Sequence, residues 1–96
     1  MSSDAIYRRY VVKTYGITLE ELDTLYEEQE HSCKLCGVHV SELEGKKTKL
    51  CVDHCHTTGK VRGLLCAKCN SVLGLANDSP AILQKAIDYL KDHSNE

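Results

Sequence analysis

Four of the six cysteines form two Cys-x-x-Cys pairs, Cys33/Cys36 and Cys66/Cys69, which are separated by 29 residues. Two residues between thiolates allow one tight turn to present both sulfur atoms to an ion about 2.3 Å away, and two such turns complete a tetrahedron. In a reducing compartment this spacing indicates metal ligands rather than disulfides. The sequence therefore predicts one structural Zn²⁺ on these four cysteines.

A structural metal suits the size and composition of the chain. Its 96 residues predict a single domain over residues 1–96. With no Trp, no Phe and five Tyr, a hydrophobic core would give the fold only marginal stability unless a metal or a covalent cross-link added to it. Structural zinc can contribute on the order of 10 kcal/mol to folding. A hydrophobic content of 42% excludes a disordered chain.

The two remaining cysteines leave a second ligand assignment open. In that alternative the first pair binds an ion together with Cys51 and Cys55, and the second pair binds one together with His54 and His56. We favour the four-cysteine set because Cys51 and Cys55 are separated by three residues, which makes a poorer turn. Cys51 also falls within a predicted strand, where it would act as a small buried hydrophobe.

Hydrophobic spacing and turn residues predict a small α+β fold. Thr18 and Glu21 fit a capping box at the start of the second helix, and Ser79-Pro80 fits the start of the last one. The apolar stripe of that last helix, within residues 82–90, is expected to pack in the core. We expect helices over 4–14, 19–30, 66–76 and 79–93, strands over 50–52 and 61–65, and a loop over 38–48. A zinc-bound core over residues 16–78 would thus lie between a basic N-terminal helix (1–15) and a C-terminal helix (79–93).

The formal net charge of −2 hides a strong segregation of charge. Residues 16–30 carry six acids and no base, whereas residues 46–70 carry six bases against one acid. Clustered Lys and Arg attract phosphates whatever the total charge, so this distribution favours a nucleic-acid partner. The candidate phosphate contacts are Lys60, Arg62 and Lys68, together with Arg8, Arg9 and Lys13 on the N-terminal helix. The loop lysines, Lys46, Lys47 and Lys49, would attract DNA toward the site. Arg62 has a second interpretation, as a structural ion-pair residue.

A second candidate site combines an acid, a histidine and an asparagine. Asp53 and His54 follow the first strand, and Asn70 comes directly after the second cysteine pair. If the zinc holds the following helix beside the hairpin, Asn70 comes near Asp53. A carboxylate and an amide oxygen suit Mg²⁺ or Mn²⁺, which also accept phosphate oxygens. His54 would point away from Asp53 and could act on water.

The block from Val52 to Gly74, which begins VDHCHTTGKVRGLLC, together with Tyr15-Gly16-Ile17-Thr18 and the first cysteine pair, resembles the phage recombination endonuclease VII family. That family belongs to the HNH, or ββα-metal (His-Me finger), nucleases. The resemblance covers about residues 7–78. It implies a metal-dependent DNA endonuclease that leaves a 5′-phosphate and a 3′-hydroxyl, usually encoded by a phage.

The resemblance also implies a role for each matched residue. Asp53 and Asn70 would hold the catalytic ion, and His54 would be the general base that deprotonates the attacking water. His56 would assist catalysis or contact phosphate. The structural zinc would be bound by Cys33, Cys36, Cys66 and Cys69.

Two departures from the family pattern limit what the resemblance implies. Family members that resolve junctions are longer dimers, so the substrate (duplex or branched DNA) and a homodimer both stay open. Broader HNH enzymes often have a His at the position of Asp78, so we assign no third protein ligand to the catalytic ion. The alternative functions are a catalytically inactive zinc-stabilised nucleic-acid-binding module and a zinc module that binds proteins.

The expected compartment is the cytoplasm, which for a phage-encoded protein is that of the bacterial host. The N-terminal residues MSSDAIYRRY contain no apolar stretch of the signal-peptide type. No apolar run approaches the roughly 18 residues of a membrane helix, so we expect no membrane partner.

Overall fold

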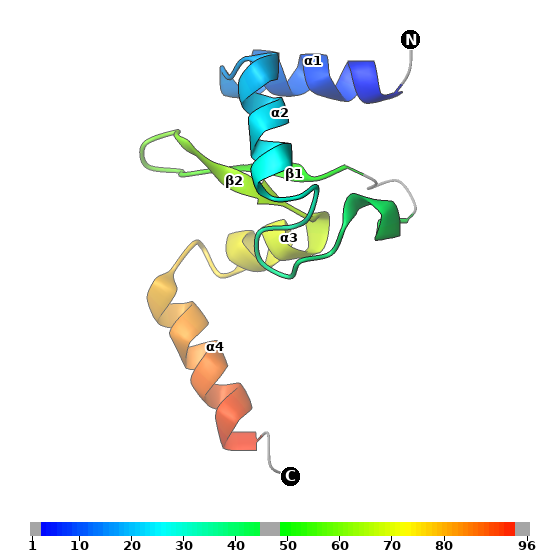
Figure 1. Ribbon diagram of the computed structural model, residues 1–96. Helices are drawn as coiled ribbons and strands as arrows, with labels where there is room; N and C mark the ends of the chain where they lie inside the picture. Colours follow the sequence, from blue (N-terminus) through cyan, green and yellow to red (C-terminus); the bar gives the residue numbers. More distant parts are fainter. Residues whose placement is uncertain (1–2, 45–48, 94–96) are drawn as a thin grey trace.

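The computed structural model describes residues 3–44 and 49–93, which form four α-helices and a two-stranded antiparallel sheet (Figure 1). The sheet lies between α2 on one side and α3 on the other, and α1 crosses the end of α2. This confirms a small α+β fold. In chain order the elements are α1 (Ser3–Tyr15), α2 (Leu19–Glu28), the 3₁₀ helix η1 (Val40–Glu42), β1 (Cys51–His54), β2 (Val61–Leu65), α3 (Ala67–Leu75) and α4 (Pro80–His93).

The two strands pair with one irregularity at the end of β1. Asp53 lies opposite Gly63, but the next residue, His54, lies opposite Val61. Arg62 is therefore an extra residue in β2 with no partner in β1, which is the arrangement of a β-bulge. A bulge redirects the side chain that it carries, and here that side chain is a guanidinium beside Asp53.

The start of α2 confirms the predicted capping box. Glu21 N–H donates to Thr18 Oγ1 over 3.0 Å, and Thr18 N–H donates to Glu21 Oε1 over 3.1 Å. These bonds satisfy two of the amide groups that a helix start leaves unpaired. Leu22 then points inward and is fully buried. The helix ends at Glu28, before the predicted residue 30.

A side-chain amide joins the end of α2 to the sheet. Gln29 Nε2 donates to the carbonyls of Ser32 (2.8 Å) and Leu64 (2.9 Å), and Gln29 Oε1 accepts from Leu64 N–H at 2.9 Å. Gln29 thus pairs with β2 as a neighbouring strand would. A Cβ at Gly63 would lie 3.2 Å from Gln29 Oε1 and 3.0 Å from Lys34 Cδ, so glycine allows both side chains to cross the strand.

The buried core is thin and centres on the sheet. Val11, Leu22, Leu50 and Leu64 are its fully buried side chains. Tyr7 from α1 reaches this layer and donates its hydroxyl to the Leu50 carbonyl over 2.8 Å. The remaining buried hydrophobic residues are Val52, Leu65, Cys33, Cys66 and Cys69, so the cysteine pairs belong to the core itself.

The expectation that the apolar stripe of the last helix packs in the core is wrong. No residue of α4 is buried, and Ile82, Ile87 and Leu90 are 44–66% exposed. Ser79 caps the helix as predicted, with Ile82 N–H donating to its Oγ over 3.2 Å, but the turn before it directs α4 away from the body (Figure 1). The Cα radius of gyration is 15.2 Å, whereas a compact domain of this length would have about 12.5 Å.

Two smaller differences concern the strand and the loop. β1 extends to His54, beyond the predicted end at residue 52, because Asp53 and His54 continue the ladder. The segment predicted as loop contains η1, which begins where Ser41 N–H donates to His39 Nδ1 over 3.1 Å. Lys46 and Lys47 lie outside the described residues.

Among the helices described, none has the length and apolar character needed to cross a membrane.

We predict that Gln29→Ala lowers the free energy of unfolding by about 1–3 kcal/mol, since it leaves the buried N–H of Leu64 without an acceptor. Urea denaturation of the zinc-loaded protein measures the change. Gln84→Ala is the matched control, because that exposed amide makes one bond, to Asp88, on the surface of α4. Equal stability of the two variants would show that the Gln29 clamp does not stabilise the fold.

Candidate functional site

The four predicted zinc ligands meet in space. The sulfur atoms of Cys33, Cys36, Cys66 and Cys69 all lie within 4.8 Å of one another, and those of Cys36 and Cys66 are 3.8 Å apart. A tetrahedral ion with bonds of about 2.3 Å separates its sulfur ligands by about 3.8 Å. Within the described residues, this is the one group of three or more His, Cys, Asp or Glu side chains close enough to share an ion. The cluster fits Zn²⁺.

Backbone turns build each half of the cluster. In the first pair, Cys33 N–H donates to Val38 O over 2.9 Å and Gly37 N–H donates to Cys33 O over 3.0 Å. Gly37 has a φ of +80°, which a residue with a side chain rarely adopts. In the second pair, Cys66 caps the start of α3 and Cys69 lies one turn further along it. A shared ion therefore joins this helix to the turn that follows α2.

The local field already favours a thiolate at one ligand. Burial would raise the pKa of Cys33, but backbone hydrogen bonds from the two cysteine turns outweigh it and lower that pKa to about 6. Burial raises the pKa of Cys69 to about 12, and the neighbouring sulfur atoms of the cluster add to the increase. A cation with two positive charges would favour the thiolate form of all four ligands.

The alternative ligand set is wrong. Cys51 and Cys55 lie outside the cluster, and both are partly exposed rather than buried. Cys55 lies in the hairpin, where the hydroxyl and N–H of Thr58 and the N–H of Thr57 lower the pKa of its thiol to about 7.

The carboxylate of Asp53 is buried at the end of β1 and paired with the bulged arginine. Arg62 Nε lies 2.7 Å from Asp53 Oδ2, and Arg62 Nη2 lies 2.9 Å from Asp53 Oδ1. Two parallel bonds of this kind are the strongest arrangement of a carboxylate with a guanidinium. They raise the pKa of Arg62. Arg62 thus makes the structural ion pair, and its contact with phosphate stays a prediction.

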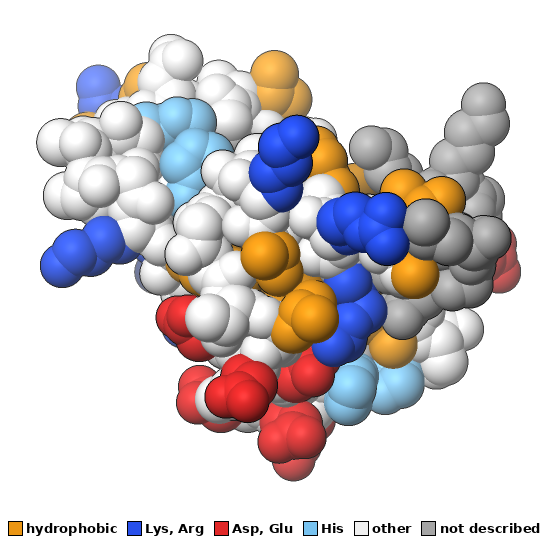
Figure 2. All heavy atoms as spheres, turned by 90° about the horizontal axis from the view of Figure 1, so that it is seen from above, with side chains coloured by type: hydrophobic (Ala, Val, Ile, Leu, Met, Phe, Trp, Pro, Cys, Tyr) orange, Lys and Arg blue, Asp and Glu red, His pale blue; other side chains and the backbone are white. Residues whose placement is uncertain are grey.

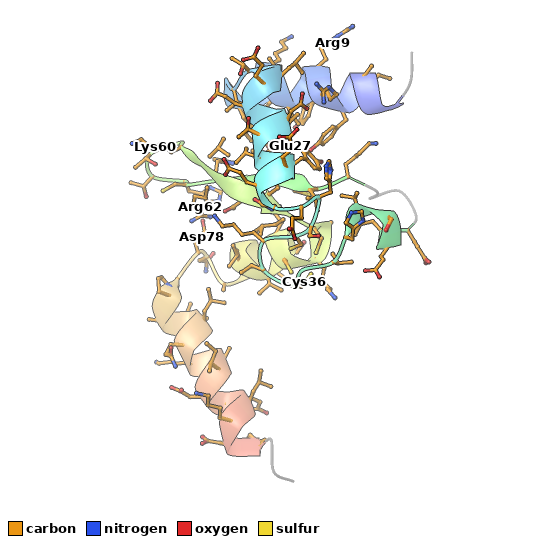
Figure 3. All side chains as sticks on the ribbon, in the orientation of Figure 1. Arg9, Glu27, Cys36, Lys60, Arg62 and Asp78 are labelled. Carbon is orange, nitrogen blue, oxygen red and sulfur yellow. The ribbon has the colours of Figure 1, made fainter. Side chains whose placement is uncertain are left out.

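A second carboxylate approaches the same guanidinium. Asp78 Oδ2 lies 3.7 Å from Arg62 Nη2 and 3.2 Å from Nε2 of His56. Figure 3 shows Arg62 and Asp78 side by side between the sheet and the end of α3. These side chains line a cavity of about 490 Å³ between the hairpin and the end of α3. The strand end therefore carries a row of charged and titratable groups: Asp53, Arg62, Asp78 and His56.

His54 lies in a row of rings. Its ring centroid is 5.4 Å from that of Tyr15 at the end of α1 and 5.0 Å from that of His56. Burial raises the pKa of Tyr15. Asn70, in the first turn of α3, lines a separate cavity of about 340 Å³ together with Tyr15 and Val52. The structure joins Asp53 to Arg62, and a shared ion on Asp53 and Asn70 stays a prediction.

The predicted phosphate contacts are spread over the molecule. Arg8 forms an ion pair with Asp23 of α2 and holds the pKa of that carboxyl below its usual range. Lys60 lies in the hairpin and Arg9 on α1, well apart in Figure 3. Lys13 and Lys68 are exposed as well. Seen from above, acidic side chains gather toward one edge of the molecule, and some Lys and Arg side chains lie directly beside them while others are spread over the rest of this face (Figure 2).

Two residues at this site were not singled out as functional from the sequence. Asp78 lies 25 residues after Asp53 in the chain. Tyr15 lies at the end of α1, far in the sequence from the strands and from α3. Tyr15 belongs to the quoted family block, which was the available signal for it. For Asp78 the signal was its place just before the Ser79 cap, because the residues that end α3 are held close to the hairpin.

The geometry defines a small α+β domain built around a cysteine metal site, with charged side chains at the end of its first strand. The model of the recombination endonuclease VII family matches residues 8–92, and the chain belongs to that family. It is similar to the Gene 59 protein of Mycobacterium phage D29, with 46% identity over 90 residues, and to that of Mycobacterium phage L5, with 43% over 89 residues. The matches cover 93% and 92% of this chain and 52% of each relative, so the chain spans about half of their length. No solved structure matches.

We predict one tightly bound Zn per chain, measured by elemental analysis of the purified protein. Cys69→Ser should lose the metal and, with it, the cooperative unfolding transition, because zinc binding and folding are linked. Cys51→Ser is the matched control and should keep one Zn, since that sulfur lies outside the cluster. A stoichiometry of two or of none would contradict the ligand set.

Proposed function

We propose that this protein is a metal-dependent DNA endonuclease that hydrolyses phosphodiester bonds to a 5′-phosphate and a 3′-hydroxyl. The observation that carries the proposal is the match to the recombination endonuclease VII family over residues 8–92, which includes the strand end with Asp53 and His54. The cysteine cluster supports it, since it can hold α3 against the hairpin that bears those residues.

We further propose that β1, β2 and α3 form a ββα-metal (His-Me finger) core of the HNH type. Three features support this: the strand–strand–helix order, the Asp53-His54 pair at the end of β1, and Asn70 in the first turn of α3. The β-hairpin supplies the acid and the histidines, and the zinc site sets the helix beside it.

In this mechanism His54 takes the proton from the attacking water. An imidazole with a pKa near ~6.5 in free solution can accept a proton at neutral pH. The rings of Tyr15 and His56 flank His54 and restrict its orientation. His56 is largely exposed at the cavity mouth, where it can assist catalysis or contact a phosphate oxygen.

Asp53 and Asn70 would hold a catalytic Mg²⁺ or Mn²⁺. A carboxylate and an amide oxygen are the hard donors that these ions prefer. Each oxygen of Asp53 accepts one hydrogen bond from Arg62 and has a second lone pair, so the carboxylate can bind a further partner. When bound, such an ion supplies Lewis-acid stabilisation of charge on the scissile phosphate. The basic residues Lys60, Lys68, Arg9 and Lys13 would contact the DNA backbone.

The proposed function also implies an origin, a substrate and a cellular compartment for the protein. The chain would be phage-encoded and would act on duplex or branched DNA in the cytoplasm of the bacterial host. The exposed apolar stripe of α4, which includes Ile87 and Leu90, would allow a homodimer to form.

A second candidate function is a catalytically inactive, zinc-stabilised nucleic-acid-binding module. The bidentate pairing of Asp53 with Arg62 favours it, because that pair already neutralises the carboxylate. A plasmid-nicking assay separates the two functions, since a binding module retards DNA in a gel without cutting it.

We predict that the purified protein nicks supercoiled plasmid in the presence of Mg²⁺ or Mn²⁺ and not in EDTA. His54→Ala and Asp53→Ala should each lower the rate at least ~10²-fold, the lower range for loss of a proton-transfer group. His93→Ala, on the exposed end of α4, is the matched control and should keep the wild-type rate. Gel electrophoresis of nicked and linear plasmid measures the rates.

Equal activity of the wild type and both site variants would identify a contaminating nuclease and refute the proposal. Retarded plasmid with no nicking under any metal condition would support the binding module instead.

A further inference from the structure

The end of α3 is built in an unusual backbone conformation. Asn77 and Asp78 both have a φ of +54°, the left-handed region in which residues with a side chain are uncommon. The turn is held by Asp78 N–H donating to Leu73 O over 2.8 Å and Asn77 N–H donating to Gly74 O over 3.0 Å. A helix often ends on one left-handed residue, usually Gly or Asn. Here a second such residue follows and carries a carboxylate, so the turn fixes where that carboxylate lies.

The carboxylate of Asp78 bridges two groups of the proposed nuclease site. One oxygen, Oδ2, faces both His56 Nε2 at 3.2 Å and Arg62 Nη2 at 3.7 Å. The side chain of Asp78 is 21% exposed and that of His56 is 69% exposed. The acid is therefore the more buried partner, and the imidazole is the more exposed one.

We propose that Asp78 is a positioning residue of this nuclease site, which acts on the reaction through His56. The contact of Asp78 with Nε2 of His56 leaves the other ring nitrogen, Nδ1, available to the site and holds the imidazole at the mouth of the cavity. Asp78 also approaches the guanidinium of Arg62, at the same Nη2 that donates to Asp53. Two carboxylates thus lie beside Arg62, and Asp78 does not touch the substrate.

Asp78 also ends α3, so a purely structural role is the competing explanation. The left-handed backbone separates the two roles. Glycine adopts a positive φ without strain and asparagine tolerates it, so neither Asp78→Gly nor Asp78→Asn should weaken the turn. Both variants remove the charged oxygen that faces His56.

The test is a double-mutant cycle on plasmid nicking, and it rests on the proposed function. We expect Asp78→Asn and Asp78→Gly to lower kcat by at least ~10-fold, as loss of an orienting partner does at other sites, with KM changed less than about twofold. In a His56→Ala background, Asp78→Asn should have less than about a twofold effect, because residues that act through one another are not additive. Asp88→Asn, which removes an exposed carboxylate from α4, is the control for charge and should keep the wild-type kcat.

Nitrogen-15 NMR of the imidazole rings in the zinc-loaded protein without DNA gives a readout that needs no activity. Asp78→Asn should shift the ring resonances of His56 and leave those of His93 in place. Unmoved His56 resonances, or a loss of kcat that is fully additive with His56→Ala, would overturn the role of Asp78. If the wild type nicks plasmid and Asp78→Asn equals Asp88→Asn, the role of Asp78 alone fails. If the wild type does not nick at all, the proposed function fails with it.

Discussion

The meeting of four cysteine sulfur atoms is the contact on which the rest of this structure depends. It joins the turn after α2 to the start of α3. Among the described residues, four large side chains are fully buried, which is little for a domain of this length. Because α3 carries Asn70 and the turn after it carries Asp78, an ion on these cysteines would also set where both side chains lie relative to the hairpin.

The hairpin has two stabilising features, the hydrogen bonds of Gln29 to β2 and the bulge at Arg62. Gln29 pairs its amide with both backbone groups of Leu64, so hydrogen bonds join the end of α2 to β2 in addition to the packing of Leu22 in the core. Two residues before Leu64, the bulge turns Arg62 onto Asp53. A buried carboxylate without such a partner would cost several kcal/mol, and the pairing with Arg62 compensates for the burial of Asp53.

Much of the local structure could be predicted because its causes are local. The capping box of Thr18 and Glu21 and the Ser79 cap depend on residues three apart, and both formed as expected. The zinc ligands were predictable because the geometry of a Cys-x-x-Cys turn is the same wherever it occurs. The prediction that the apolar stripe of α4 packs in the core was wrong. Hydrophobic spacing shows that a helix has an apolar face, but it does not show what covers that face.

The sequence by itself determined the element order, the four cysteine ligands, the family and the candidate residues Asp53, His54 and Asn70. Only the tertiary structure decided that Arg62 pairs with Asp53, that Asp78 lies against His56, and that α4 leaves the body. The physical reason is distance along the chain. Each of these outcomes depends on a bulge or on a left-handed turn that redirects residues from different elements, and neither side-chain spacing nor composition specifies that direction.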